Sequence, residues 1–138
     1  MGMSRRLLLA LAAAGGLSAT VAVALPLGAL AGLQHGRWTL KEIGTATPPR
    51  QVCAPDPAEL IQLNHPGDAC TRYTIDDAPN RVTIQYNCQK RGYGRTTITV
   101  ENAGLMRLDT QGIDSVGQPF DTSYEGRFVG PCGPTPRR

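Results

Sequence analysis

Between residues 81 and 88, apolar and polar side chains alternate without a break, and this pattern constrains the fold more than any other feature of the sequence. One face carries Val82, Ile84, Tyr86 and Cys88, and the other carries Arg81, Thr83, Gln85 and Asn87. Successive side chains of a strand point to opposite faces, so the pattern is typical of a strand with one buried side. The segment therefore indicates an antiparallel sheet with one face in solvent.

Most of the chain after residue 36 repeats this period of two, carried by Thr, Val, Ile and Tyr and interrupted by turn residues at short intervals. We expect strands over 37–45, 50–53, 70–75, 81–88, 93–100, 105–112 and 119–129. Short turns between successive strands favour antiparallel neighbours. The predicted fold is mainly β: a curled antiparallel meander of about seven strands, sandwich-like or half-barrel-like, because a sheet of this size curls or closes.

One stretch between the second and third expected strands has the signals of a short helix. Asp56 suits the N-cap, Pro57 the first helical position and Glu59 the third, and apolar residues follow. The sequence NHPG at 64–67 ends the helix. We expect this helix to cross between two parts of the sheet and to plug one end or edge of it.

The first thirty or so residues differ in character from the rest. Arg5 and Arg6 precede an apolar run that reaches Leu33 without a charge, which is the order of a signal peptide. Small residues with the spacing that signal peptidase reads end at Ala24 and at Ala31. We expect residues 1–31 to form an N-terminal signal helix that is removed after Ala31. Cleavage after Ala24 and retention as an uncleaved membrane anchor are the alternatives. Residues 32–136 would be the exported antiparallel β domain.

All four cysteines, Cys53, Cys70, Cys88 and Cys132, follow this segment, and an even number in an exported chain indicates disulfides. Gaps of 17, 18 and 44 positions disfavour zinc, which prefers close ligand pairs. Cys70 begins one strand and Cys88 ends its hairpin partner, so the two lie at one end of the sheet. Cys53 and Cys132 meet if the first and last strands pair antiparallel. We therefore expect the disulfides Cys70–Cys88 and Cys53–Cys132.

The orientation of Cys70 conflicts with the apolar pattern of its own strand. Cys70 has the same parity as Arg72, whereas Tyr73 and Ile75 have the opposite parity. If Cys70 turns inward to meet Cys88, either the strand contains a bulge or the cysteine lies just before the strand.

Several of these features, taken in order, resemble a known bacterial family. In this chain they are Gly36-Arg37-Trp38, Val52-Cys53 before a short acidic helix, Cys70, Tyr86-Asn87-Cys88 and the closing run from Tyr124 to Cys132. Together they resemble the family called domain of unknown function 3617. Many members have Leu-Trp-Glu where this chain has Arg37-Trp38-Thr39, and methionine-rich later strands where this chain has only Met106. The resemblance implies a periplasmic or secreted protein of one β domain, and it implies no activity.

The charges of the expected exported part nearly balance. The chain has 14 basic residues, of which Arg5 and Arg6 precede the apolar run, so 12 remain against 11 acidic residues. These basic residues are scattered along the sequence, so we expect no nucleic-acid partner. Contact with a membrane is expected only through the N-terminal segment, and only if it is uncleaved.

No group of residues in the sequence has the pattern of a catalytic site. His35 and His65 are the only histidines, and neither lies beside a serine or cysteine in a nucleophile context. Asp76-Asp77, Asp109 and Asp114 are interpreted as turn residues whose side chains close the backbone. We therefore expect no catalytic residue, no metal and no cofactor.

The leading hypothesis is an exported, non-enzymatic envelope protein, periplasmic or secreted, that binds a small apolar molecule within the curved sheet or an envelope protein on its face. The aromatic residues that would line such a site or fill the core are Trp38, Tyr73, Tyr86 and Tyr124. A hydrolase or isomerase that uses carboxylates such as Asp109 or Asp114 is one alternative. A purely structural envelope protein is another.

Overall fold

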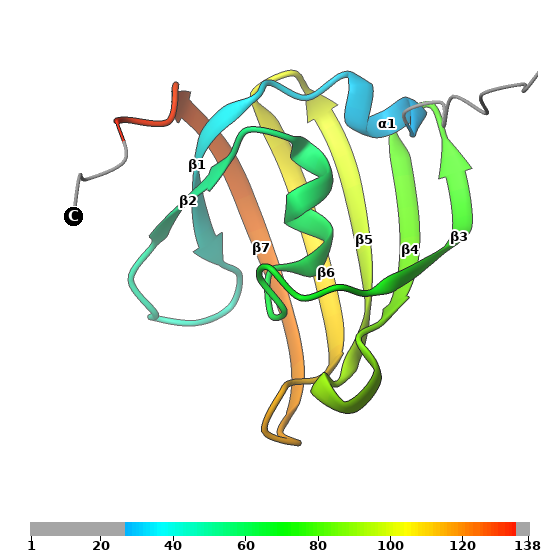
Figure 1. Ribbon diagram of the computed structural model, residues 1–138. Helices are drawn as coiled ribbons and strands as arrows, with labels where there is room; N and C mark the ends of the chain where they lie inside the picture. Colours follow the sequence, from blue (N-terminus) through cyan, green and yellow to red (C-terminus); the bar gives the residue numbers. More distant parts are fainter. Residues whose placement is uncertain (1–26, 135–138) are drawn as a thin grey trace, which may run out of the picture.

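The computed structural model describes residues 27–134 and arranges them around one antiparallel sheet of seven strands (Figure 1). The strands are β1 (Gly36–Glu42), β2 (Arg50–Ala54), β3 (Thr71–Ala78), β4 (Arg81–Asn87), β5 (Tyr93–Asn102), β6 (Leu105–Ile113) and β7 (Pro119–Gly130). The helical elements are α1 (Gly28–Ala31) and two 3-10 helices, η1 (Pro57–Gln62) and η2 (Gln89–Arg91). Residues 1–26 of the expected signal helix lie outside the described residues. From 27 to 134, no helix is long and apolar enough to cross a membrane.

The order of the strands across the sheet is β2-β1-β7-β6-β5-β4-β3. The last five strands form a meander in which each pairs with the next, and β1 closes onto β7 with Trp38 opposite Phe128. The predicted curled antiparallel meander of about seven strands is confirmed. Its two edges are β2 and β3, and the sheet remains open between them.

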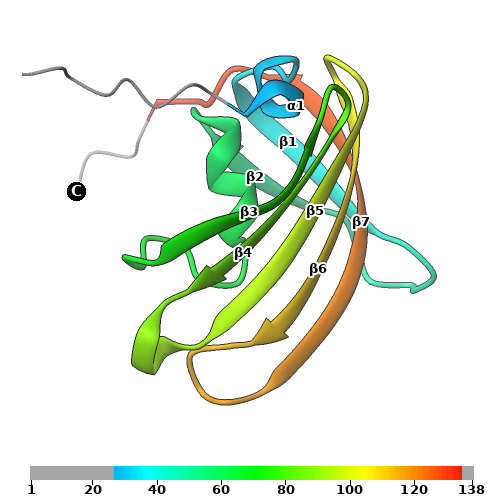
Figure 2. The same ribbon diagram turned by 90° about the vertical axis from the view of Figure 1, so that its right-hand side faces the viewer.

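The sheet curls so that its concave face encloses the core (Figure 2). In β4 the alternation is as expected, because Val82, Ile84 and Tyr86 are buried while Arg81 and Gln85 are exposed. The same face of the neighbouring strands supplies the other large buried side chains, which are Trp38, Leu40, Ile98, Met106 and Leu108.

Strand β3 resolves the conflict over Cys70 mainly by turning its apolar side chains outward, with Tyr73 57 % and Ile75 55 % exposed. Cys70 precedes the strand, as one of the two expectations had it, and the shift in pairing with β4 comes later, between Thr74 and Asp76. Asp76 and Asp77 lie within this strand, so the expectation that they form the turn is wrong. Asp77 pairs with Val82, which shortens the connection to the next strand to two residues, Pro79 and Asn80.

The expected helix is the 3-10 helix η1, with Asp56 as its N-cap. A carboxylate oxygen of Asp56 accepts from the backbone N–H of Ala58 at 2.9 Å. The expected position at an end or edge of the sheet is wrong, because η1 lies across the concave face (Figures 1 and 2). Leu60 and Ile61 are each 1 % exposed, so this short helix forms a second layer over the core.

The folded part of the chain starts earlier than residue 32, where the exported domain was expected to begin. Ala29 and Leu30 of α1, together with Leu33, are buried in the same apolar cluster as the sheet residues. The backbone N–H of Gln34 then donates to the carbonyl of Ala103 at 2.9 Å, which joins this segment to the turn between β5 and β6.

Two disulfides fasten the sheet, Cys53–Cys132 and Cys70–Cys88. These are the two pairs expected from the order of the strands. The first connects the edge strand β2 to the segment after β7, and the second connects the start of β3 to the end of β4. Each bond therefore secures one of the two open edges.

Candidate binding cleft

The open side of the curled sheet contains a cleft of about 440 Å³. Its walls come from β2, from η1 and the connection that follows it, and from Arg72 of β3. This volume lies within the range of roughly 300–1,000 Å³ found for small-molecule sites. Apolar side chains make up part of the lining, and they are Val52, Ala54, Leu60, Leu63 and Pro66.

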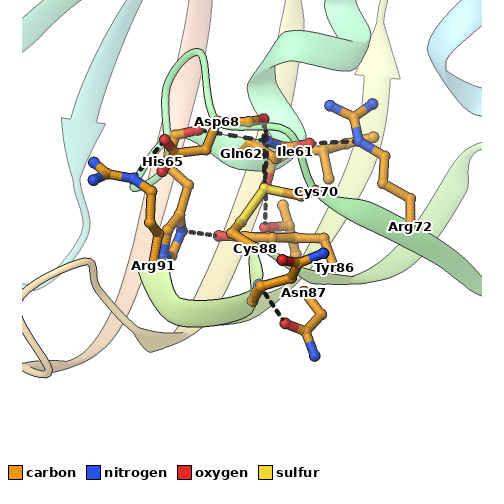
Figure 3. The surroundings of a disulfide bond; sticks show 12 residues. Ile61, Gln62, His65, Asp68, Cys70, Arg72, Tyr86, Asn87, Cys88 and Arg91 are labelled. Atoms are coloured by element: carbon orange, nitrogen blue, oxygen red, sulfur yellow. Dashed lines mark hydrogen bonds and ion pairs between the residues drawn. A yellow bond between two sulfur atoms is a disulfide. The ribbon is translucent and has the colours of Figure 1, made fainter.

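Arg72 points into the cleft from the edge strand β3. It pairs with Tyr86 across β3 and β4, and paired residues share a face, so its side chain lies on the concave side. Its Nε donates to Oε1 of Gln62 at 2.6 Å (Figure 3). Within residues 27–134, its two terminal NH2 groups have no hydrogen-bond partner. Arg72 is thus held at one nitrogen and retains donors for another group.

Gln62 is the buried residue that orients Arg72. Gln62 lies at the end of η1 and is only 7 % exposed. Its Nε2 lies 3.2 Å from the carbonyl oxygen of Asp68 and 3.1 Å from Sγ of Cys70. The carboxamide therefore has its nitrogen toward the connection before β3, which leaves Oε1 free to accept from Arg72. Since Cys70 is bonded to Cys88, the disulfide fixes the connection that positions this amide (Figure 3).

Arg50 lines the same cleft from the opposite edge strand, β2. Its guanidinium carbon lies 5.5 Å from the centroid of the Tyr124 ring, within the range of a cation–π contact. Arg50 pairs with Leu40, a buried residue, so this side chain is also on the concave side. The two edges of the sheet thus each contribute one arginine to one cleft.

The acidic residues of the cleft offset part of this charge. Asp68 is engaged by Arg91, whose Nε lies 2.7 Å from its carboxylate, and this ion pair lies beside the cleft (Figure 3). Glu59 is exposed on η1 and also lines the cleft. The polar lining is therefore mixed, with Arg50 and Arg72 as its inward-facing cations.

Buried hydrogen bonds attach η1 and the residues after it to the sheet. The hydroxyl of Thr96 donates to the carbonyl of Ile61 at 2.7 Å, so the hydroxyl of Thr110, 2.9 Å from that of Thr96, donates to Thr96. Nδ1 of His65 lies 3.1 Å from the hydroxyl of Tyr86, which forms a second buried link.

Burial has the largest effect on the pKa of Tyr86. Burial raises the pKa of Tyr86 to about 12, although the hydrogen bond with Thr110 and the charge of Arg72 act in the opposite direction. His65 is fully buried, and within residues 27–134 its Nε2 has no hydrogen-bond partner. A buried polar atom without a partner costs about 1–3 kcal/mol.

The structure separates the two carboxylates considered as catalytic. Asp109 lies within β6 and not in a turn, because the strand continues to Ile113. Burial tends to raise the pKa of the Asp109 carboxyl, but hydrogen bonds from Arg107 and Ser123 and the charge of Arg107 hold it below its usual value. Asp114 closes the turn after β6, where its carboxylate accepts from the N–H groups of Val116 and Gln118. Five residue steps along an extended chain place the Cα atoms of Asp109 and Asp114 roughly 16 Å apart.

The four candidate aromatic residues divide between the core, its margin and the surface, and none of them lines the cleft. Trp38 and Tyr86 are fully buried, and Nε1 of Trp38 donates to the carbonyl of Gln34 at 3.2 Å. Tyr124 is half-buried beneath Arg50. Tyr73 is 57 % exposed, so it belongs to neither the core nor the cleft. Its position follows from the parity of β3: with Arg72 turned inward, Tyr73 must turn outward.

Comparison with family models, with curated proteins and with solved structures finds no match for this chain. Function must therefore be inferred from the residues themselves. Sequence reasoning overlooked Gln62 and Arg72 as a pair. The sequence did indicate where Arg72 points. Residues two apart in a strand share a face, so an inward-facing Cys70 places Arg72 on the inner side as well.

Proposed function

We propose that this protein is an exported, non-enzymatic binding protein whose cleft takes a small molecule with an apolar body and an anionic group. The observation that carries the proposal is the inward-facing Arg72, held by the buried Gln62 in a cleft with an apolar lining. Guanidinium groups with free N–H donors match carboxylate, sulfonate and phosphate oxygens. The apolar body of the ligand would rest on Val52 and Leu63.

Export supports this proposal from a separate direction. Two disulfides are consistent with an oxidising, exported location. The positive residues and apolar run at the N-terminus favour a signal peptide, and with it a periplasmic or secreted protein. Membership of the domain of unknown function 3617 family remains a proposal that agrees with this location.

A small ligand is favoured over a protein partner added as a strand to the sheet. Inward-pointing charges and acidic side chains on an edge strand are devices that prevent further strands from pairing. Strand β3 carries Arg72 on its inner side, and Asp76 and Asp77 follow in the same strand. The edge therefore has features that oppose strand addition.

The test uses two fluorescent probes that differ only in charge. Anilinonaphthalene sulfonate has an aromatic body and a sulfonate, whereas N-phenyl-1-naphthylamine has the same body without the charge. Each probe is titrated into the purified, oxidised protein. We expect Arg72→Met to weaken binding of the sulfonate about tenfold, because the variant loses one charge-assisted hydrogen bond at a partly exposed site. Binding of the neutral probe should stay unchanged.

Three further variants localise the binding. Leu63→Asp, which places a charge among the apolar lining residues, should weaken both probes. Glu59→Gln, which removes one of the two acidic residues of the cleft, should strengthen binding of the sulfonate alone. Arg127→Met is the matched control, because this exposed arginine pairs with Glu125 and does not line the cleft. Equal losses in the Arg72 and Arg127 variants, or no binding of either probe, would refute the proposal.

A further inference from the structure

The segment from Leu27 to Leu33 belongs to the folded domain as firmly as the strands do. Ala29 is 1 % exposed, Leu30 6 % and Leu33 3 %. These side chains lie in one cluster with Val82 and Ile98, and α1 lies across the ends of β3, β4 and β5 (Figure 1). The segment therefore covers one end of the concave face.

The anchoring of this segment continues into the first strand. Leu33 is followed by Gln34, whose N–H donates to Ala103 and whose carbonyl accepts from Nε1 of Trp38 at 3.2 Å. Trp38 is the largest of the fully buried side chains. A chain that began at Gly32 would lack both buried residues of α1, and the apolar ends of Val82 and Ile98 would lose that cover.

We infer that signal peptidase cuts the chain after Ala24 and not after Ala31, so that the mature domain begins at Leu25 and retains α1. This inference rests on the proposed export. The sequence offers small residues at both places, but only the earlier one leaves Ala29 and Leu30 in the product.

The covalent step is hydrolysis of one peptide bond by the signal peptidase of the exporting cell. Water breaks the amide between the carbonyl carbon of Ala24 and the nitrogen of Leu25. Its hydroxyl becomes part of the new carboxyl group of Ala24, and its proton goes to the new amino group of Leu25.

The full chain is expressed, and the intact mass of the exported, purified product identifies the cleavage site. We expect the mass of residues 25–138 with two disulfides. Ala24→Leu should abolish this product, because signal peptidase requires a small residue there. Ala31→Leu, at an exposed position, should leave the product unchanged.

The stability of the exported protein provides an independent readout. If α1 is retained, Leu30→Ser lowers the Tm of the purified protein by roughly 10 °C, because it removes a buried side chain. If the serine variant yields no folded protein, the milder Leu30→Val replaces it and should give a smaller decrease in Tm. Ala31→Ser is the matched control, and its exposed position predicts a change within about 2 °C.

A product that begins at Gly32, with a Tm insensitive to Leu30, would overturn the inference. An exported, oxidised chain that still begins at Met1 would overturn it as well. A chain that begins at Met1 and has four reduced cysteines in the cytoplasm would instead refute the proposed export, so the two failures can be told apart.

Discussion

Thr96 donates through its hydroxyl to the carbonyl oxygen of Ile61 at 2.7 Å, and this bond joins the centre of the sheet to the helix that forms one wall of the cleft. Both residues are about 1 % exposed, so neither group has water as a substitute partner. The position of η1, and with it the position of Gln62, depends on a hydroxyl that points inward from β5.

Replacing this hydroxyl should loosen η1 without changing the volume of the side chain. We expect Thr96→Val to lower the free energy of unfolding by about 1–3 kcal/mol, because the Ile61 carbonyl loses the donor, and the Thr110 hydroxyl the acceptor, that Thr96 provides. Urea unfolding measures the loss. The half-buried Thr99 lies in the same strand, and Thr99→Val should cost less than about 0.5 kcal/mol. Equal costs at the two positions would contradict the assigned hydrogen bond.

The buried phenol of Tyr86 predicts a loss of stability in base. Burial raises the pKa of Tyr86 from 10.0 to about 12, so the folded state holds its proton more tightly than the unfolded state does. The associated stability is complete below pH 10 and is lost as the pH rises to about 12, a change of about 3 kcal/mol. Urea unfolding at several pH values measures this slope. Tyr86→Phe should remove that part of the slope, and a slope unchanged in the variant would contradict this assignment.

Gly94 gives the Tyr86 ring the room it occupies. A Cβ atom at Gly94 would collide with the phenol ring and hydroxyl of Tyr86, its partner in β4. We expect Gly94→Ala to destabilise the protein by about 1–3 kcal/mol, the range for overpacking a filled core. At Gly104 a Cβ would make only ordinary contacts, so Gly104→Ala serves as the control in thermal unfolding. A Tm that falls equally in both variants would show that Tyr86 is not the obstacle.

The two disulfides should contribute unequally to stability. Loss of Cys53–Cys132, which closes a loop of 79 residues, should cost about 4–5 kcal/mol in the chain-entropy model, and loss of Cys70–Cys88, with 18 residues, about 3 kcal/mol. Unfolding of the paired cysteine-to-serine variants measures both. Non-reducing peptide mapping provides the complementary check, in which a Cys53–Cys70 peptide would disprove the pairing.

The sequence allowed prediction of features that depend on neighbouring residues. Alternation at Val82, Ile84 and Tyr86 predicts a half-buried strand because the period of two is a local property of the backbone. The capping at Asp56 is local in the same way. The turn assigned to Asp76 and Asp77 failed because pairing with β4 extended the strand over residues whose own preference is for turns.

Features that depend on distant residues were beyond prediction from the sequence. Gln62 and Arg72 meet because η1 crosses the concave face, and that placement comes from Thr96, many residues later. The segment containing Leu30 could not be separated from the expected signal segment, since an apolar run that inserts in a membrane and one that fills a core have the same composition.

The pairing of β1 with β7 has a consequence for a chain that crosses a membrane N-terminus first. The strands from β3 onward can pair as they emerge, each with the one before it, and Cys88 finds Cys70 within one hairpin. The hairpin of β1 and β2 has to wait, because its neighbour in the sheet is the last strand to arrive. Until then Trp38 has no Phe128 to contact and Cys53 has no Cys132 to bond. If the protein is exported as proposed, the earliest part of the domain to leave the cell interior is thus the last to reach its final place.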